Sequence, residues 1–197
     1  MLKHVDKEVT IAVTPNGYAD AITVNPEDGK EYFVMPEEVK MQMSRFLRCL
    51  DDRHGAVYYC QRQNSNLHDF PELFGDLDHS FLDFAYEAFG KNPDAINFWF
   101  GDERAVTSMH KDPFENIYLV ISGYKDFLLI PPTDVHLVPR KIVQSAIYES
   151  DETGAFHIRP LFDENDNTPT EIEWVSVDPM NPNLAKYPNY KKANVLK

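Results

Sequence analysis

The sequence has few cysteines, no long apolar run and few basic residues, and each of these scarcities excludes a class of protein. Its two cysteines, Cys49 and Cys60, form no CxxC pair, which predicts reduced thiols rather than a disulfide framework. No apolar run approaches the ~18 residues that a membrane helix needs. The first residues, Met1 to Val9, carry charges where a signal peptide would be apolar. We therefore expect a cytoplasmic protein, or one that is also nuclear, without membrane contact.

The shortage of basic residues gives the chain a strongly negative charge. Lys and Arg together number 19 against 32 Asp and Glu, for a formal net charge of −13. Nucleic-acid binding needs a basic face to meet phosphates, so no direct contact with nucleic acid is expected. A hydrated acidic surface and a surface that attracts a basic protein substrate both remain open. At 197 residues, the chain is long enough for one domain that buries roughly 70% of its unfolded surface.

Short apolar segments separated by turn residues predict a mainly β protein. Alternating or β-branched patterns predict strands at residues 8–14, 32–35, 56–62, 142–148, 155–158 and 172–177. Apolar residues at helical spacing predict one helix from Pro36 to Leu50 and another from Ser80 to Phe89, where Gly90 follows. Residues 63–79 and 178–190 are rich in loop-forming residues. Many short strands and two helices favour a β-sandwich or jelly roll with flanking helices.

The stretch from Ala95 to Pro132 carries most of the functional information. Its apolar runs and turn residues predict three or four short strands, and His110 and Asp112 lie two residues apart within it. Side chains two apart on a strand point to the same side, so this imidazole and carboxylate can form two corners of a metal site. The His-x-Asp pattern is weak by itself, because His4 and Asp6 repeat it in a charged terminus. A surface histidine beside a hydrated aspartate remains the alternative.

Lys125 is the second informative residue, because it lies in an otherwise apolar segment. If that segment is a strand, Lys125, Phe127 and Leu129 share one face. A lysine on a covered face needs an anionic partner, since an unpaired buried charge is costly, whereas at a sheet edge its ammonium group reaches water. A metal corner together with an inward lysine suggests a cavity that holds a metal and an anion. Thr107 would face away from His110 on a regular strand, because their offset is odd.

Other motif classes find little support in the sequence. No Ser-His-Asp arrangement, nucleophile elbow or glycine-rich phosphate loop stands out. Phe98 and Phe100 are expected in the core, whereas Trp99 fits the mouth of a cavity equally well. The remaining histidines are expected to be surface or packing residues, and they are His54, His68, His79, His136 and His157.

Several ungapped blocks of the sequence resemble the Jumonji-C oxygenases. These blocks are Asn97–Trp99, Ala105–Asp112, Glu115–Tyr118, Ser122–Lys125 and Pro131–Pro132. Further matching blocks lie on both sides of them, so the resemblance extends in order over nearly the whole chain. It implies an iron(II)- and 2-oxoglutarate-dependent enzyme with a double-stranded β-helix fold, a jelly roll of the cupin-like kind with flanking helices.

The resemblance implies roles for individual residues. His110 and Asp112 match the first two ligands of a facial triad of two histidines and one carboxylate, whose ligand types suit iron(II). Lys125 and Thr107 match residues that bind the distal carboxylate of 2-oxoglutarate, and a charge-assisted bond from the lysine would direct the keto acid toward the metal. Further matches line the pocket, with Tyr59 and Asn116 on the cosubstrate side and Asn97, Trp99 and Tyr118 on the substrate side.

The sequence also departs from the Jumonji-C pattern. The third ligand of the family is a histidine in a strand beyond the loop at residues 178–190, and no histidine follows that loop before Lys197. The helical N-terminal region of the relatives has no counterpart either. We therefore expect residues 1–197 to be a single partial Jumonji-C domain, incomplete at its C-terminal strands. Such a chain is expected to bind iron weakly and not to hydroxylate.

Three functions remain as interpretations. The first is a protein lysyl hydroxylase, for which the resemblance implies lysine side chains of developmentally regulated GTP-binding proteins as substrates. The second is a non-catalytic cupin-like module that binds a partner. The third is an endopeptidase, an activity ascribed to some relatives, although no nucleophile–base pair supports it and two metal ligands make a poor zinc protease site.

Overall fold

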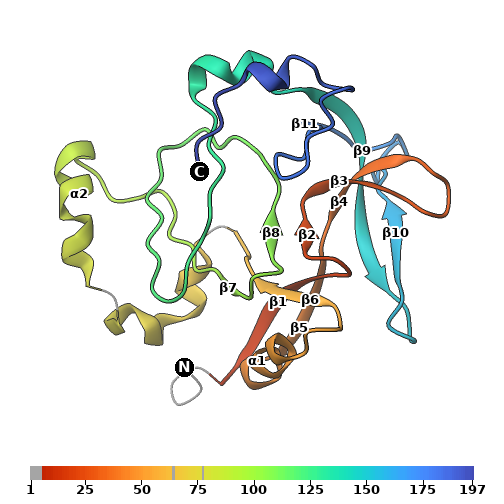
Figure 1. Cartoon of the computed structure of the whole chain (residues 1–197). Helices are drawn as coiled ribbons and strands as arrows, with labels where there is room; N and C mark the ends of the chain where they lie inside the picture. The colour runs from red at the N-terminus through yellow and green to blue at the C-terminus, as the bar shows by residue number, and fades with distance from the viewer. Residues whose placement is uncertain (1–5, 64, 77) are drawn as a thin grey trace. The chain divides into compact units, whose positions relative to one another are not determined.

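The computed structural model describes residues 6–63, 65–76 and 78–197, and it is built mainly from short strands (Figure 1). Its backbone contacts divide the chain into two compact units. Unit 1 contains the residues up to Ala19 together with residues 36–106 and 148–157. Unit 2 contains residues 20–35, 107–147 and 158–197. Of the two His-x-Asp motifs, the one that begins at His4 lies outside the described residues.

Unit 1 is centred on a four-stranded antiparallel sheet in the order β5-β1-β6-β7. Val9, Ile11 and Val13 of the first strand are all buried, as their alternation predicted, because side chains two apart share a face of the sheet. The bend at Pro15–Gly17 then leads into the short strand β2 (Tyr18–Ala19). The strands of the sheet are β1 (Glu8–Thr14), β5 (Glu37–Gln42), β6 (Val57–Cys60) and β7 (Phe100–Gly101).

The helix predicted from Pro36 begins seven residues later than expected, at Met43. Residues Glu37–Gln42 are instead strand β5, which pairs with β1 along its whole length. Within it Met41 is buried between two exposed neighbours, which is the alternation of a strand rather than of a helix. Six paired residues outweigh the helical spacing of the apolar side chains, because tertiary pairing overrides weak local propensity. Helix α1 is therefore limited to Met43–Asp51.

The core of unit 1 forms where α1 packs on this sheet. Met43, Phe46 and Ile11 have no exposed surface, and burying each such side chain contributes about 1.5–3 kcal/mol. The Phe100 ring meets Phe46 edge-on, with ring centroids 5.6 Å apart. Phe98 packs against the same cluster, so the expectation that Phe98 and Phe100 are core residues is confirmed.

The rest of unit 1 consists of short helical turns and one further helix. Asn66 is buried and clamps the backbone of Phe98: its Oδ1 accepts from the Phe98 amide at 2.6 Å and its Nδ2 donates to the Phe98 carbonyl at 2.8 Å. The second predicted helix is confirmed, and Gly90 ends it in the left-handed conformation at φ +64°. These elements are the 3₁₀ turns η1 (Asn66–Asp69), η2 (Pro71–Asp76) and η3 (His79–Leu82) and the helix α2 (Asp83–Phe89).

Unit 2 contains a five-stranded sheet in the order β10-β9-β4-β3, with β11 paired to β9 beyond the end of that path. Pairing is antiparallel for β3 with β4 and for β9 with β11, and parallel for β4 with β9. The hairpin predicted around Thr153 and Gly154 is confirmed, although its tip, residues 148–157, is grouped with unit 1. The strands are β3 (Ala21–Val24), β4 (Glu31–Met35), β9 (Arg140–Ser150), β10 (Phe156–Pro160) and β11 (Glu171–Val175).

The segment between β8 (Val106–Thr107) and the 3₁₀ turn η4 (Pro132–Leu137) contains none of the strands predicted there. A strand exists only through ladder hydrogen bonds, and in the described chain this segment pairs only at Leu129, which exchanges both backbone bonds with Leu196. The later turn η5 (Tyr190–Lys192) completes the elements. Within the described residues, no helix combines the length and apolarity of a membrane span. Several apolar side chains of the unpaired segment are exposed, namely Phe114, Ile117, Ile121, Tyr124 and Phe127.

Candidate metal site

His110 and Asp112 lie side by side in unit 2, although no strand holds them. The Nε2 atom of His110 is 3.5 Å from Oδ2 of Asp112. The other ring nitrogen, Nδ1, is 2.8 Å from the backbone carbonyl oxygen of Ser108. A carbonyl oxygen only accepts, so Nδ1 donates its hydrogen to Ser108 and Nε2 is the ring nitrogen directed at Asp112. The carboxylate of Asp112 and the Nε2 atom of His110 therefore face each other.

Ser108 links the histidine to two other parts of unit 2. Its hydroxyl donates to the backbone carbonyl of Asp20 and accepts a hydrogen bond of 3.0 Å from Nε1 of Trp174 in β11. The Trp174 indole is stacked with the His110 ring, with centroids 6.0 Å apart and planes 15° apart. On its own sheet, Trp174 also contacts Phe33 of β4, with centroids 4.6 Å apart.

Asp20 brings a second carboxyl group near His110. Burial raises the pKa of Asp20 above its ordinary value, and the positive charge of a protonated His110 partly offsets that effect. Its backbone has a positive φ of 54°, an uncommon conformation for a residue other than glycine. Sequence reasoning missed Asp20, Ser108 and Trp174. Only Ser108, two residues before His110, carried a local signal, because the other two come from distant parts of the chain.

The structure supports a metal at His110 and Asp112 in part. The two side chains keep 35% and 55% of their surface exposed, so a cation from solvent can reach both donor atoms. Imidazole and carboxylate are also the donor types that iron(II) accepts. Within the described residues, however, no group of three or more His, Cys, Asp or Glu side chains is arranged to share an ion. The pair fits two positions of an iron site, and the family's third histidine ligand stays a prediction.

The other unit 2 residues implied by the resemblance are not joined to this pair by a strand face. Lys125 is half-buried, and burial lowers its pKa below the ordinary value. Its expected strand with Phe127 and Leu129 is wrong, because the segment has no ladder partner there. Tyr118 packs edge-on against Phe127, with ring centroids 5.0 Å apart. Thr107 and Asn116 are exposed, so the cosubstrate roles of all these residues stay predictions.

Three implied pocket residues belong to unit 1. Tyr59 lies in β6 opposite Gly101 of β7, where a Cβ atom would come 2.5 Å from the tyrosine ring. Asn97 has a structural partner, because its Oδ1 accepts the backbone amide of Ser65 at 2.9 Å. Trp99 is half-buried. Their roles as pocket-lining residues also stay predictions.

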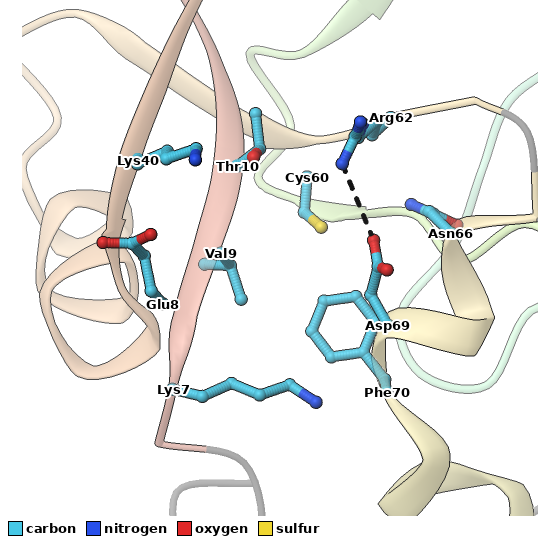
Figure 2. A pocket seen from close by; sticks show the side chains of 10 residues that line it. All are labelled: Lys7, Glu8, Val9, Thr10, Lys40, Cys60, Arg62, Asn66, Asp69 and Phe70. Atoms are coloured by element: carbon cyan, nitrogen blue, oxygen red, sulfur yellow. Dashed lines mark ion pairs between the residues drawn. The ribbon is translucent and has the colours of Figure 1, made fainter.

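One cavity of unit 1 lies away from these residues and has a volume of about 300 Å³. Figure 2 shows two of its cations beside acidic or aromatic groups: Arg62 points at Asp69, 4.0 Å away, and Lys7 extends toward the Phe70 ring. The Lys7 ammonium group also pairs with Glu72 at 3.2 Å. Burial raises the pKa of the Cys60 thiol in this cavity to about 12, which keeps it protonated and a poor nucleophile. Cys60 is therefore not suited to act as a protease nucleophile.

Comparison with known proteins adds independent evidence. A human protein named bifunctional peptidase and (3S)-lysyl hydroxylase is 42% identical over 193 residues, which cover 96% of this chain and 57% of that protein. JmjC domain-containing protein E of Dictyostelium discoideum is 36% identical and covers 88% of this chain and 52% of its own length. A lysine-specific demethylase of Arabidopsis thaliana is 36% identical, with coverages of 88% and 49%. The chain thus spans about half the length of the curated relatives it matches.

A family match covers the chain itself. Residues 2–197 match the family described as a cupin-like domain. Mostly antiparallel sheets with few helices agree with the jelly-roll architecture of that family, so the predicted fold class and the resemblance to Jumonji-C proteins are confirmed. A single domain that is incomplete at its C-terminal strands stays a prediction. This chain belongs to the cupin-like domain family.

Proposed function

We propose that the protein is an iron(II)- and 2-oxoglutarate-dependent oxygenase that hydroxylates lysine side chains of a protein substrate. The observation that carries this proposal is the His110–Asp112 pair, in which Nε2 faces a carboxylate oxygen at 3.5 Å while Nδ1 is held by the Ser108 carbonyl. The relatives named a lysyl hydroxylase and a lysine-specific demethylase support lysine as the target. A net charge of −13 is compatible with attraction of a basic substrate segment.

The residues of this chain have distinct roles in the proposed reaction. Bound iron and 2-oxoglutarate supply the chemistry overall: dioxygen and the keto acid give succinate and carbon dioxide, and the second oxygen atom enters the substrate C–H bond. His110 and Asp112 hold the metal through Nε2 and a carboxylate oxygen. Lys125 meets the distal carboxylate of 2-oxoglutarate, and its partial burial strengthens that charge-assisted bond because fewer waters compete. Thr107 adds a hydroxyl donor to the same carboxylate.

A non-catalytic cupin-like module is the second candidate function. It is favoured by the donor count, since the described residues bring two metal donors together and no third. A module of this kind would bind a partner protein without consuming 2-oxoglutarate. Proteins in the cytoplasm or nucleus with exposed lysines, including developmentally regulated GTP-binding proteins, are the proposed partners in either case.

The test measures succinate formed with iron(II), 2-oxoglutarate and lysine-containing peptides, both by residues 1–197 alone, where little is expected, and by a chain that also carries the family's third histidine ligand. In the longer chain, lysyl hydroxylation predicts succinate and a peptide that gains one oxygen atom, both lost in the variants His110→Ala and Asp112→Ala. His157→Ala is the matched control, because His157 faces Asp151 at 3.4 Å in a similar exposed pair. Specific binding of a lysine-rich peptide without succinate from either chain would support the binding module instead. Succinate formation that survives both substitutions would refute the proposed site.

A further inference from the structure

His110 and Asp112 lie in a segment whose backbone has no ladder partner, so something other than a strand must orient them. Metal sites need their donor atoms held within about 0.5 Å of a productive geometry. An exposed imidazole on an unpaired segment rotates and changes its tautomer unless one of its nitrogens is engaged. The contacts that engage it in this chain come from Ser108 and from Trp174.

Trp174 is fixed by its sheet rather than by the unpaired segment. It lies in β11, where it is paired with Lys141 of β9. Phe33, whose ring contacts the indole, lies in β4, and β4 pairs with the same strand β9 at Ser145. Contacts within three adjoining strands therefore fix the indole, and the His110 ring stacks against it with ring centroids 6.0 Å apart.

Ser108 connects that indole to the histidine. Its hydroxyl accepts from Trp174 Nε1 at 3.0 Å and donates to the carbonyl of Asp20, so both of its hydrogen-bond directions are used. With the side chain held at both ends, the carbonyl of Ser108 is fixed where it accepts Nδ1–H of His110 at 2.8 Å. A carbonyl that accepts the free ring N–H of a metal-ligating histidine sets the tautomer and direction of that ring.

We propose that Trp174 and Ser108 are positioning residues that hold the His110 ring with Nδ1 donating to the Ser108 carbonyl and Nε2 directed at Asp112. The inference rests on the proposed function only for the identity of the ion, because the hydrogen bonds themselves concern the metal-free chain. Trp174 supplies a flat surface and one N–H donor. Ser108 accepts the indole N–H through its hydroxyl, and its backbone carbonyl accepts the imidazole N–H.

The experiment separates positioning from simple packing with conservative variants. Trp174→Phe keeps an aromatic face and removes the N–H donor, and Ser108→Ala removes the hydroxyl. Ser108→Thr keeps the hydroxyl and serves as the rescue, while Trp99→Phe controls for the loss of a tryptophan. Nitrogen–proton correlation spectra of the metal-free protein report the His110 tautomer, and calorimetry with cobalt(II) reports metal affinity. In the Trp99→Phe protein, quenching of Trp174 fluorescence by cobalt(II) reports binding beside the indole.

We expect a single His110 tautomer in the wild type and in the Thr and Trp99 variants. In Ser108→Ala and Trp174→Phe we expect a mixture of tautomers and an affinity for cobalt(II) lowered by about 10- to 100-fold. An unchanged His110 tautomer in both variants would overturn the inference. If neither chain makes succinate but the His110 tautomer depends on Ser108, the positioning role holds and the proposed activity fails.

Discussion

Replacing Gly17 by alanine should destabilise unit 1 far more than an ordinary glycine substitution. Gly17 has a φ of +86°, and a Cβ atom there would lie 1.9 Å from the carbonyl oxygen of Arg104. Those neighbouring atoms are backbone and cannot rotate away, so the turn itself must move. Moving it breaks the 2.9 Å hydrogen bond from the Val106 amide to the Gly17 carbonyl.

The magnitude follows from three contributions to the free energy of unfolding. A side chain in the left-handed region costs about 1–2 kcal/mol. Forcing backbone apart at a packed contact costs about 1–3 kcal/mol, and the lost hydrogen bond costs about 1 kcal/mol. Together they predict a loss of about 3–6 kcal/mol for Gly17→Ala, a large share of the ~5–15 kcal/mol that stabilises a typical domain.

Gly90→Ala is the matched control for this prediction. Gly90 has a φ of +64° and also lies in unit 1, but a Cβ atom there would have no heavy atom within 4 Å. It should therefore cost only the backbone term, about 1–2 kcal/mol. Urea unfolding followed by Trp99 fluorescence in a Trp174→Phe background reports on unit 1 alone. Equal losses for the two alanine variants would refute the close-contact argument.

Three further predictions follow from buried or paired groups. Asn66→Ala should lower the free energy of unfolding of unit 1 by about 2–4 kcal/mol, because two partly buried backbone groups of Phe98 lose their partners. Urea unfolding measures this loss, and a loss below that of an exposed Asn→Ala control contradicts the prediction. In the native protein a thiol reagent should modify Cys49, which is partly exposed. The buried Cys60, whose pKa is raised to about 12, should react only after unfolding. Mass spectrometry of the modified peptides shows which cysteine has reacted under each condition. Hydrogen bonds from Thr153 and the backbone lower the pKa of Asp151 to about 2. The stability that ionised Asp151 gives to the hairpin is therefore complete above the ordinary pKa of 3.8 and is lost as the pH falls through about 2. An NMR titration of Asp151 with a midpoint near 3.8 would contradict this prediction.

Local patterns predicted those elements whose structure depends on their own residues. The alternation of Val9, Ile11 and Val13 is enough for β1, because burial on one face of a strand has a period of two. Gly90 ends α2 because few other residues adopt its positive φ without cost. The turn at Thr153 and Gly154 is held by Asp151, whose Oδ1 accepts from the Thr153 amide and hydroxyl and from the Ala155 amide. In each case the deciding interaction lies within a few residues.

Elements decided by distant pairing could not be predicted in this way. Val39 and Met43 have helical spacing, but Val39 and Met41 also share a strand face, and only the presence of β1 chooses between the two patterns. The opposite error occurred at Lys125, where an apolar alternation predicted a strand that finds no ladder partner in the described chain. A strand is a property of two segments, so one segment's sequence cannot establish it.

The closeness of His110 and Asp112 was predicted for a reason that the structure replaces, and their role as metal ligands stays a prediction. Strand parity placed His110 beside Asp112, whereas the contacts that hold the histidine come from Ser108 and Trp174. Closeness alone does not distinguish the site, because His157 and Asp151 are 3.4 Å apart and His110 and Asp112 are 3.5 Å apart.

The difference lies in what each carboxylate already binds. Asp151 accepts three further hydrogen bonds from Thr153 and Ala155, and a cation must compete with them for its lone pairs. Asp112 accepts no other hydrogen bond within the described part of the chain, so both of its oxygens remain available to a metal. A histidine held by Ser108 and Trp174 beside a carboxylate with no other hydrogen bond among the described residues is therefore the feature that would separate the proposed metal site from an exposed ion pair. For that reason cobalt(II) should bind at His110 and not measurably at His157.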